Sequence, residues 1–159
     1  MRSFTDYSSN WSVGERTPAL SSMQWNLLAI PAAALAIMAI LQIISFSKFK
    51  DFLESVRIGW PAVVAVALIV AELLGALSLL RIPMHPLARF VGLTLGLLAA
   101  GFWFVENLYF ATGSGGQLPN SGFFGKYLTQ SPGWWTIIEI SLLLFWILYA
   151  AELFKWRRR

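Results

Sequence analysis

Four long apolar segments constrain this chain more than any other feature of its sequence. They cover residues 27–46, 60–80, 87–110 and 134–154. An α-helix of about 20 apolar residues crosses roughly 30 Å of hydrocarbon, so each segment is long enough to span a membrane. Lipid offers the backbone no hydrogen bonds, and the segments must therefore cross as helices. We predict an all-α, integral membrane four-helix bundle.

The composition supports lipid as the main solvent of the chain. Hydrophobic residues make up 57% of the 159 residues and charged residues only 13%, about half the charged share of a typical soluble domain. The net charge of +4 does not indicate nucleic-acid binding, because the basic residues form no stripe on a polar fold. The chain has no cysteine and a single histidine, His85. We therefore expect no metal site, because cysteine-ligated zinc, iron–sulfur clusters and multi-histidine sites need more ligands.

The rest of the chain divides into a polar N-terminal segment and loops. Residues 1–23 are polar and do not resemble a cleavable signal peptide, so the membrane domain is expected to cover residues 24–159. The longest connection, residues 111–133, is expected to form an outer loop. Its aromatic residues include Phe123, Phe124 and Tyr127. A free linker would not need aromatic side chains, so we expect this loop to pack onto the helix ends.

Lysine and arginine residues near the span ends predict the orientation, because the cytoplasmic ends usually carry more of them. With the N-terminus inside, eight basic residues would face the cytoplasm and four the outside. The inner set is Arg2, Arg16, Arg81, Arg89, Lys155, Arg157, Arg158 and Arg159, and the outer set is Lys48, Lys50, Arg57 and Lys126. We predict a multi-pass protein of the plasma (inner) membrane with both termini in the cytoplasm.

Glu72 is the most informative single residue. It lies about 12 residues into the second span, roughly 18 Å along a helix and near the membrane middle. A carboxylate exposed to hydrocarbon is costly, so Glu72 is expected to face the bundle interior. One interpretation is a proton-handling or ligand-binding group, since ionisable groups inside membranes are usually functional. The other is a structural group that hydrogen-bonds to Ser78, Thr94 or Gln42.

A second group of polar residues is expected near the outer surface. The third span runs outward and the fourth inward, so Glu106 and Glu139 both lie within about two turns of that surface. Lys48 is the natural cation for them, and we expect it within salt-bridge reach of one. With Gln42 slightly deeper, these residues would form a polar pocket that opens outward above Glu72. Aromatic walls would come from Trp103, Phe104, Tyr109 and Trp135. Alternatively, each charge reaches the headgroups separately.

Small residues recur every four positions on two spans. The first stripe is Ala67, Ala71 and Gly75, and the second is Gly92, Gly96 and Ala100. Such stripes let helix backbones approach closely in lipid. We expect Gly75, Gly92 and Gly96 to pack helices within the bundle, with a dimer face as the alternative.

Short motifs within residues 30–105 carry a family resemblance. In chain order they are FSKFK at 46–50, Trp60-Pro61, AELLG at 71–75 and Leu79-Leu80. This order resembles the DoxX-like and MauE-like membrane proteins, which are small four-helix proteins. The resemblance implies that Lys48, Glu72 and Gly75 matter. It also implies an association with membrane redox systems: a quinone-linked thiosulfate oxidoreductase subunit in one branch and amine-oxidation maturation in another.

Three functions remain open at this point. The first is an accessory subunit of a quinone-linked redox system, with quinone as a non-covalent cofactor and a polar pocket for its headgroup. The second is a structural or assembly subunit without a ligand. The third is a carrier for a small solute or proton, which would need an oligomer because four helices are few for a transport path. All three imply other membrane subunits or a second copy as partners, and no arrangement of catalytic residues is recognisable.

Overall fold

The computed structural model describes residues 20–113 and 133–155, which form five α-helices and no strand. The helices are α1 (Ser22–Ile44), α2 (Phe46–Ser55), α3 (Pro61–Leu79), α4 (Pro86–Ala111) and α5 (Trp134–Lys155). All except α2 are long and apolar enough to cross a membrane, which confirms the prediction of four helical spans. Most of the predicted polar segment 1–23 lies outside the described residues.

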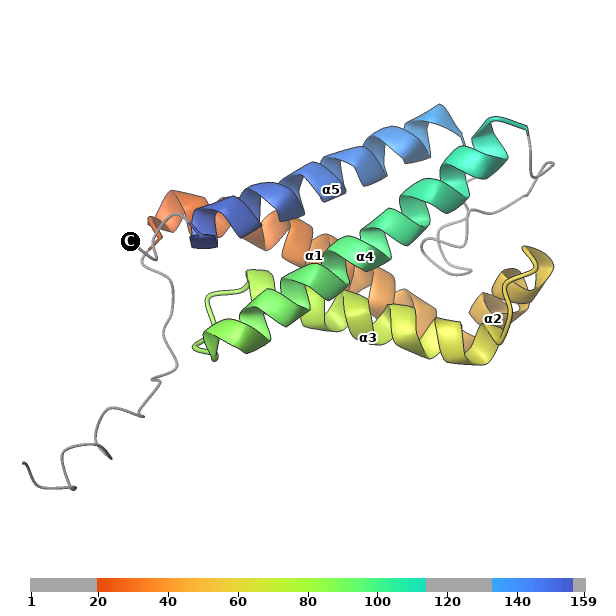
Figure 1. Ribbon diagram of the computed structural model, residues 1–159, viewed down its shortest axis with the longest axis horizontal. Coiled ribbons are helices and arrows are strands. Elements are labelled where there is room, and N and C mark those ends of the chain that lie inside the picture. The colour runs from red at the N-terminus through yellow and green to blue at the C-terminus, as the bar shows by residue number, and fades with distance from the viewer. Residues whose placement is uncertain (1–19, 114–132, 156–159) are drawn as a thin grey trace, which may run out of the picture.

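The four long helices run alternately up and down, so that consecutive spans are antiparallel (Figure 1). α3 packs against both α1 and α4, and α5 packs mainly against α4. The start of α1 and the end of α5 meet at one end, where the rings of Trp25 and Phe154 lie 6.2 Å apart. The opposite end holds α2, the end of α4 and the start of α5.

The first span is the one whose bounds differ most from the prediction. α1 begins at Ser22, before the predicted start, because Ser21 and Gln24 form a capping box. The Gln24 N–H donates to Ser21 Oγ (3.2 Å), and the Ser21 N–H donates to Gln24 Oε1 (3.0 Å). This exchange satisfies backbone donors that a helix start leaves free. α1 ends just before Ser45, where the chain bends into α2.

α2 lies across the end of the bundle (Figure 1). Its apolar residues Phe49 and Leu53 are one turn apart and both are buried. The exposed side chains of the helix include Lys48, Asp51 and Glu54. A short helix with one apolar and one charged face is typical of a membrane surface. α2 therefore covers the end of the bundle with its apolar face and directs its charges outward.

The contact between α3 and α4 depends on glycine. A Cβ added to Gly75 would lie 2.7 Å from Gly96 Cα, and one added to Gly96 would lie 2.9 Å from Gly75 Cα. A Cβ on Gly92 would lie 2.6 Å from the Leu74 carbonyl oxygen. The structure thus places all three glycines where the helices approach closely, the arrangement that small residues permit in lipid. Ala67, which belonged to the predicted stripe, is exposed instead.

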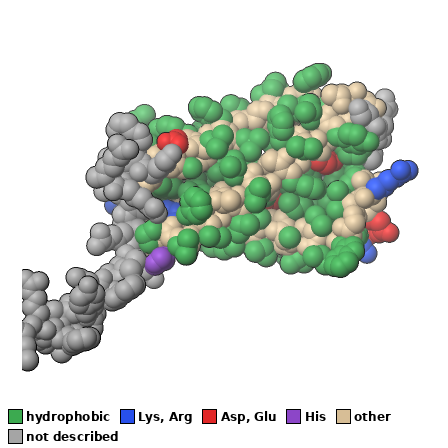
Figure 2. Space-filling view, viewed as in Figure 1, with side chains coloured by type: hydrophobic (Ala, Val, Ile, Leu, Met, Phe, Trp, Pro, Cys, Tyr) green, Lys and Arg blue, Asp and Glu red, His purple; other side chains and the backbone are tan. Residues whose placement is uncertain are grey.

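Apolar side chains cover the outside of the long helices, and charged groups gather mainly near the two ends (Figure 2). The exposed set includes Ile37, Val66, Leu98, Leu142 and Phe145. A soluble monomer rarely exposes so large an apolar surface. The four apolar helices therefore indicate a multi-pass membrane protein.

Arg89 is a buried charge near the start of α4, at the end where α1 begins and α5 ends. Its Nη1 donates to the carbonyl oxygens of Ser78 and Leu80, the latter at 3.2 Å, and its Nη2 donates to that of Ile82 at 2.5 Å. The guanidinium carbon lies 5.1 Å from the ring centre of Phe154. The negative end of the α3 dipole adds to this attraction. Arg89, which was predicted only to mark the orientation, thus caps the end of α3.

We expect Arg89→Lys to lower the stability of the folded protein by about 2–4 kcal/mol. The single ammonium group of lysine cannot replace a planar guanidinium group that donates to three carbonyl groups. The measurement is thermal unfolding in mild detergent. Arg81→Lys is the matched control, since Arg81 is exposed and should tolerate the change. Equal melting temperatures for the two variants would contradict the capping role.

Candidate functional site

A buried polar cluster joins three helices inside the bundle. It consists of Gln42 from α1, Glu72 from α3 and Trp103 from α4, all with fully buried side chains. Gln42 Nε2 donates to Glu72 Oε1 at 3.1 Å, and Trp103 Nε1 donates to the same oxygen at 2.8 Å. The second oxygen, Oε2, is buried and has no hydrogen-bond partner among the described residues. We call these three residues the Glu72 cluster.

The partners of Glu72 agree only partly with the prediction. Gln42 was one of the three expected partners and does bond to Glu72. Ser78 and Thr94 bond instead to carbonyl oxygens of their own helices, those of Leu74 (2.8 Å) and Phe90 (2.9 Å). Hydroxyl groups in helices commonly bond back to the preceding turn, and this uses the one hydrogen that each hydroxyl could donate to Glu72. Trp103, expected only as an aromatic wall, supplies the second donor.

Aromatic residues of α2 cover the Glu72 cluster. The ring of Trp103 lies 5.9 Å from that of Phe49 and 6.4 Å from that of Phe52, measured between centroids. Phe102 meets Trp103 edge-on at 5.3 Å. The indole therefore presents its N–H to Glu72 while its ring packs against apolar neighbours. This packing separates the carboxyl group of Glu72 from the end of the bundle.

A second polar pair lies closer to the end of α4. Asn107 Nδ2 donates to the Trp103 carbonyl oxygen (2.9 Å) and to Glu106 Oε2 (2.8 Å). Both side chains are buried, and Glu106 Oε1 has no hydrogen-bond partner among the described residues. Trp103 thus contacts both polar groups, through its indole and through its backbone. Asn107 was not among the predicted site residues, although its spacing of four from Trp103 could have suggested it.

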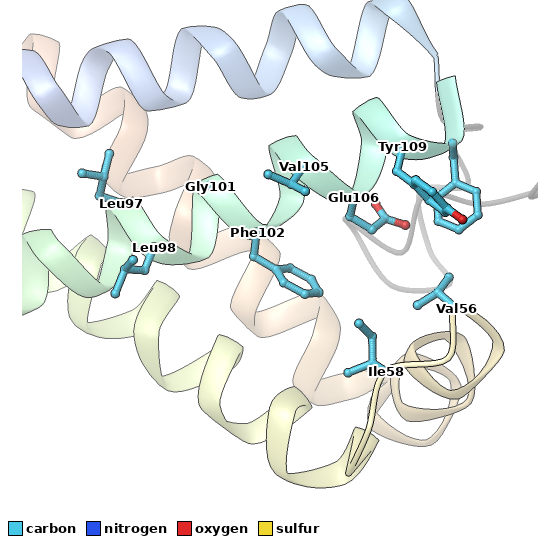
Figure 3. Close-up of a pocket in the computed structure, with 10 residues that line it drawn as sticks. Val56, Ile58, Leu97, Leu98, Gly101, Phe102, Val105, Glu106 and Tyr109 are labelled. Carbon is cyan, nitrogen blue, oxygen red and sulfur yellow. The ribbon is translucent and has the colours of Figure 1, made fainter. Parts of the chain in front are cut away.

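Glu106 lines a groove of about 630 Å³ between α4 and the connection from α2 to α3 (Figure 3). Val56 and Ile58 form the wall opposite α4. The α4 side includes Leu98, Gly101, Phe102, Val105 and Tyr109. Of the described residues that line the groove, Glu106 is the one that carries a charged group. Leu98 and Val105 are 63% and 65% exposed on the outer surface of the bundle, so the groove is open to lipid.

The structure does not bring Lys48 to the carboxyl groups of the predicted pocket. Lys48 is exposed on α2 and makes no ion pair with any described residue, so the predicted bridge to Glu106 or Glu139 is absent. The cause is the bend at Ser45, which turns Lys48 onto the outer face of α2. Glu139 and Trp135 lie on α5 and do not line the groove.

Two further predictions concern the surroundings of the site. The covering role of the outer loop, with Phe123, Phe124 and Tyr127, falls on residues 114–132, which lie outside the described residues. Within the described ranges, no group of three or more histidine, cysteine, aspartate or glutamate side chains is placed to hold a metal ion.

In comparisons with known proteins, the chain matches no family model, no curated protein and no solved structure. The resemblance of residues 46–50 and 71–75 to the DoxX-like proteins therefore stays a prediction.

Proposed function

We propose that this protein is a membrane subunit that binds the headgroup of a quinone or quinol in the groove along α4, as an accessory component of a membrane redox system. The observation that carries the proposal is the carboxyl group of Glu106. It is buried, one of its oxygens lacks a partner among the described residues, and it lies on the wall of an apolar groove. A buried polar atom without a partner is costly, and a ligand headgroup can satisfy it.

The shape and chemistry of the groove suit an amphipathic ligand from the bilayer. Its volume of about 630 Å³ falls within the range of small-molecule sites, which are mostly apolar with a few polar groups. A long apolar tail can stay in lipid beside Leu98 and Val105, while the ring of the headgroup packs against Phe102 and Tyr109. Among such ligands, a quinone is favoured by the resemblance to a family with quinone-linked members.

A structural subunit is the second candidate, and the Glu72 cluster favours it. The cluster is enclosed, and its hydrogen bonds join α1, α3 and α4. Interhelical hydrogen bonds of this kind hold membrane bundles together without any ligand. No contact among the described residues favours the carrier hypothesis, because Phe49 and Phe52 pack over the cluster.

The orientation belongs to the same proposal. We infer from the basic residues that both termini face the cytoplasm of a plasma membrane, because eight of the twelve lysine and arginine residues fall on that side. The end that carries α2 and Glu106 then lies at the outer surface. A ligand in the groove would sit in the outer leaflet, within reach of a partner subunit on that side.

The test of the proposal is ligand binding in lipid nanodiscs, with decylubiquinone and decylubiquinol as probes. Gly101→Phe should place a ring in the groove, because Gly101 lines the groove and a Cβ there meets no atom within 4 Å. We expect this variant to bind at least one probe about tenfold more weakly than the wild type, a loss of roughly 1.4 kcal/mol. Leu148→Phe is the matched control, since it adds a ring to the exposed face of α5.

The wild type should bind at least one probe saturably, and Leu148→Phe should bind it equally well. Absence of saturable binding by the wild type, or equal weakening by both substitutions, would remove the groove as the site. The structural subunit would then be the better description of the protein.

A further inference from the structure

Asn107 and Glu106 are neighbours in α4 but face different surroundings. Successive residues of an α-helix point roughly 100° apart. Glu106 lines the groove, whereas Asn107 is fully buried and does not line it. The two side chains nevertheless meet, with Asn107 Nδ2 at 2.8 Å from Glu106 Oε2. The bond therefore connects the bundle interior with the wall of the groove.

The hydrogen bonds of Asn107 determine which way its amide group points. A backbone carbonyl can only accept, so the atom that lies 2.9 Å from the Trp103 oxygen must be the amide nitrogen. That nitrogen has two hydrogens. One is directed to Trp103 and the other to Glu106, so neither remains for another acceptor. The donor that faces Glu106 is thus held in place by the backbone of the same helix.

This arrangement decides how the carboxyl group of Glu106 is presented. Oε2 is held by Asn107, and Oε1 is the oxygen left without a partner among the described residues. Glu106 lies five residues before Ala111, the end of α4, which is roughly 7.5 Å along the helix axis. A flexible carboxyl group this close to the surface can turn toward the headgroups. The bond from Asn107 opposes that rotation.

We infer that Asn107 is a positioning residue for the ligand site: it holds Glu106 Oε2 so that Oε1 is presented to a headgroup in the groove. This inference rests on the proposed function, since the ligand is the one proposed above. Asn107 does not line the groove itself and acts through Glu106. Its contribution to binding should therefore depend on the presence of the Glu106 carboxyl group.

A double-substitution cycle in nanodiscs tests this dependence, with whichever of decylubiquinol and decylubiquinone the wild type binds more tightly. Asn107→Leu keeps the size of the side chain and removes its donors. We expect Asn107→Leu and Glu106→Gln each to weaken binding about tenfold, the size of one hydrogen bond to a charged group. The double variant should bind no more weakly than either single variant, because both changes remove the same contact, the one between Glu106 Oε1 and the headgroup. Ser141→Ala is the control, since it removes a hydrogen bond to the Ile137 carbonyl group within α5.

Infrared spectroscopy supplies a second measurement that needs no ligand. The carboxyl band of Glu106 is the one lost in Glu106→Gln. It should shift in Asn107→Leu, where the bond to Oε2 is absent, and stay in place in Ser141→Ala. A general loss of stability would not move this band selectively.

Several results would overturn the inference. The first is that Asn107→Leu binds the probe as tightly as the wild type while Glu106→Gln clearly loses affinity. The second is that the losses of binding free energy in the two single variants add fully in the double variant. The third is that the carboxyl band of Glu106 does not shift in Asn107→Leu. Absence of binding by the wild type would instead remove the proposed function. The infrared band would still decide whether Asn107 holds the carboxyl group.

Discussion

Gly75→Ala and Gly96→Ala should each destabilise the folded bundle, whereas Gly101→Ala should not. The added Cβ at Gly75 or Gly96 would lie 2.7 Å or 2.9 Å from a backbone Cα of the facing helix. Backbone atoms cannot rotate away as a side chain can, so α3 and α4 must separate. Overpacking of this kind costs about 1–3 kcal/mol, and a leucine at either position should prevent folding.

Gly101 provides a matched control within α4. A Cβ there meets no atom within 4 Å, and alanine is favoured over glycine in a helix by up to about 1 kcal/mol. Unfolding in detergent, followed by circular dichroism, should therefore rank Gly101→Ala at or above the wild type and the two other variants below it. If Gly75→Ala proves as stable as Gly101→Ala, the close contact between α3 and α4 does not exist as described.

The sequence was sufficient to predict the membrane-spanning helices, because a membrane allows an apolar segment few structures other than a helix. A run of about 20 apolar residues in lipid must be helical, and the predicted second span, 60–80, differs from α3 by one residue at each end. The depth of Glu72 likewise predicted an inward side chain, since a carboxylate is costly in hydrocarbon. Gln42 was an expected partner for the same reason. These predictions followed from the solvent and needed no knowledge of tertiary contacts.

The errors arose where the chain bends or where a contact depends on three dimensions. Lys48 was placed at the end of a straight first span, but Ser45 bends the chain and α2 turns Lys48 outward. Arg89 was counted only as an orientation signal, because its contacts depend on how the chain turns between α3 and α4: its carbonyl acceptors are Ser78 at the end of α3 and Leu80 and Ile82 just after it. Trp103 was predicted only as an aromatic wall of the pocket, but its indole N–H also donates to Glu72. One-dimensional spacing indicates depth in the membrane, but it does not determine which side chains at that depth meet.

Glu72→Leu should cause a large loss of folded protein, whereas Glu72→Gln should be tolerated structurally. Leucine removes the acceptor that Gln42 Nε2 and Trp103 Nε1 share. Loss of this acceptor costs up to about 1–3 kcal/mol for each buried donor. Glutamine keeps a carbonyl oxygen that can accept from both donors. The measurements are the yield of monodisperse protein in mild detergent and its melting temperature, with Glu54→Leu on the exposed face of α2 as the control.

A rescue experiment separates lost hydrogen bonds from lost shape. Adding Gln42→Leu and Trp103→Phe to Glu72→Leu removes the two donors along with their acceptor, and replacing all partners by apolar groups can be nearly neutral. The triple variant should therefore recover part of the stability that Glu72→Leu loses.

Glu72→Gln distinguishes the structural role of Glu72 from a proton-handling role. If Glu72 is a structural group, Glu72→Gln should bind the ligand normally. If Glu72 handles protons, Glu72→Gln should be well folded but should have lost its activity. Equal stability of Glu72→Leu and Glu72→Gln would contradict the account of the Glu72 cluster, because the two donors would then need no acceptor.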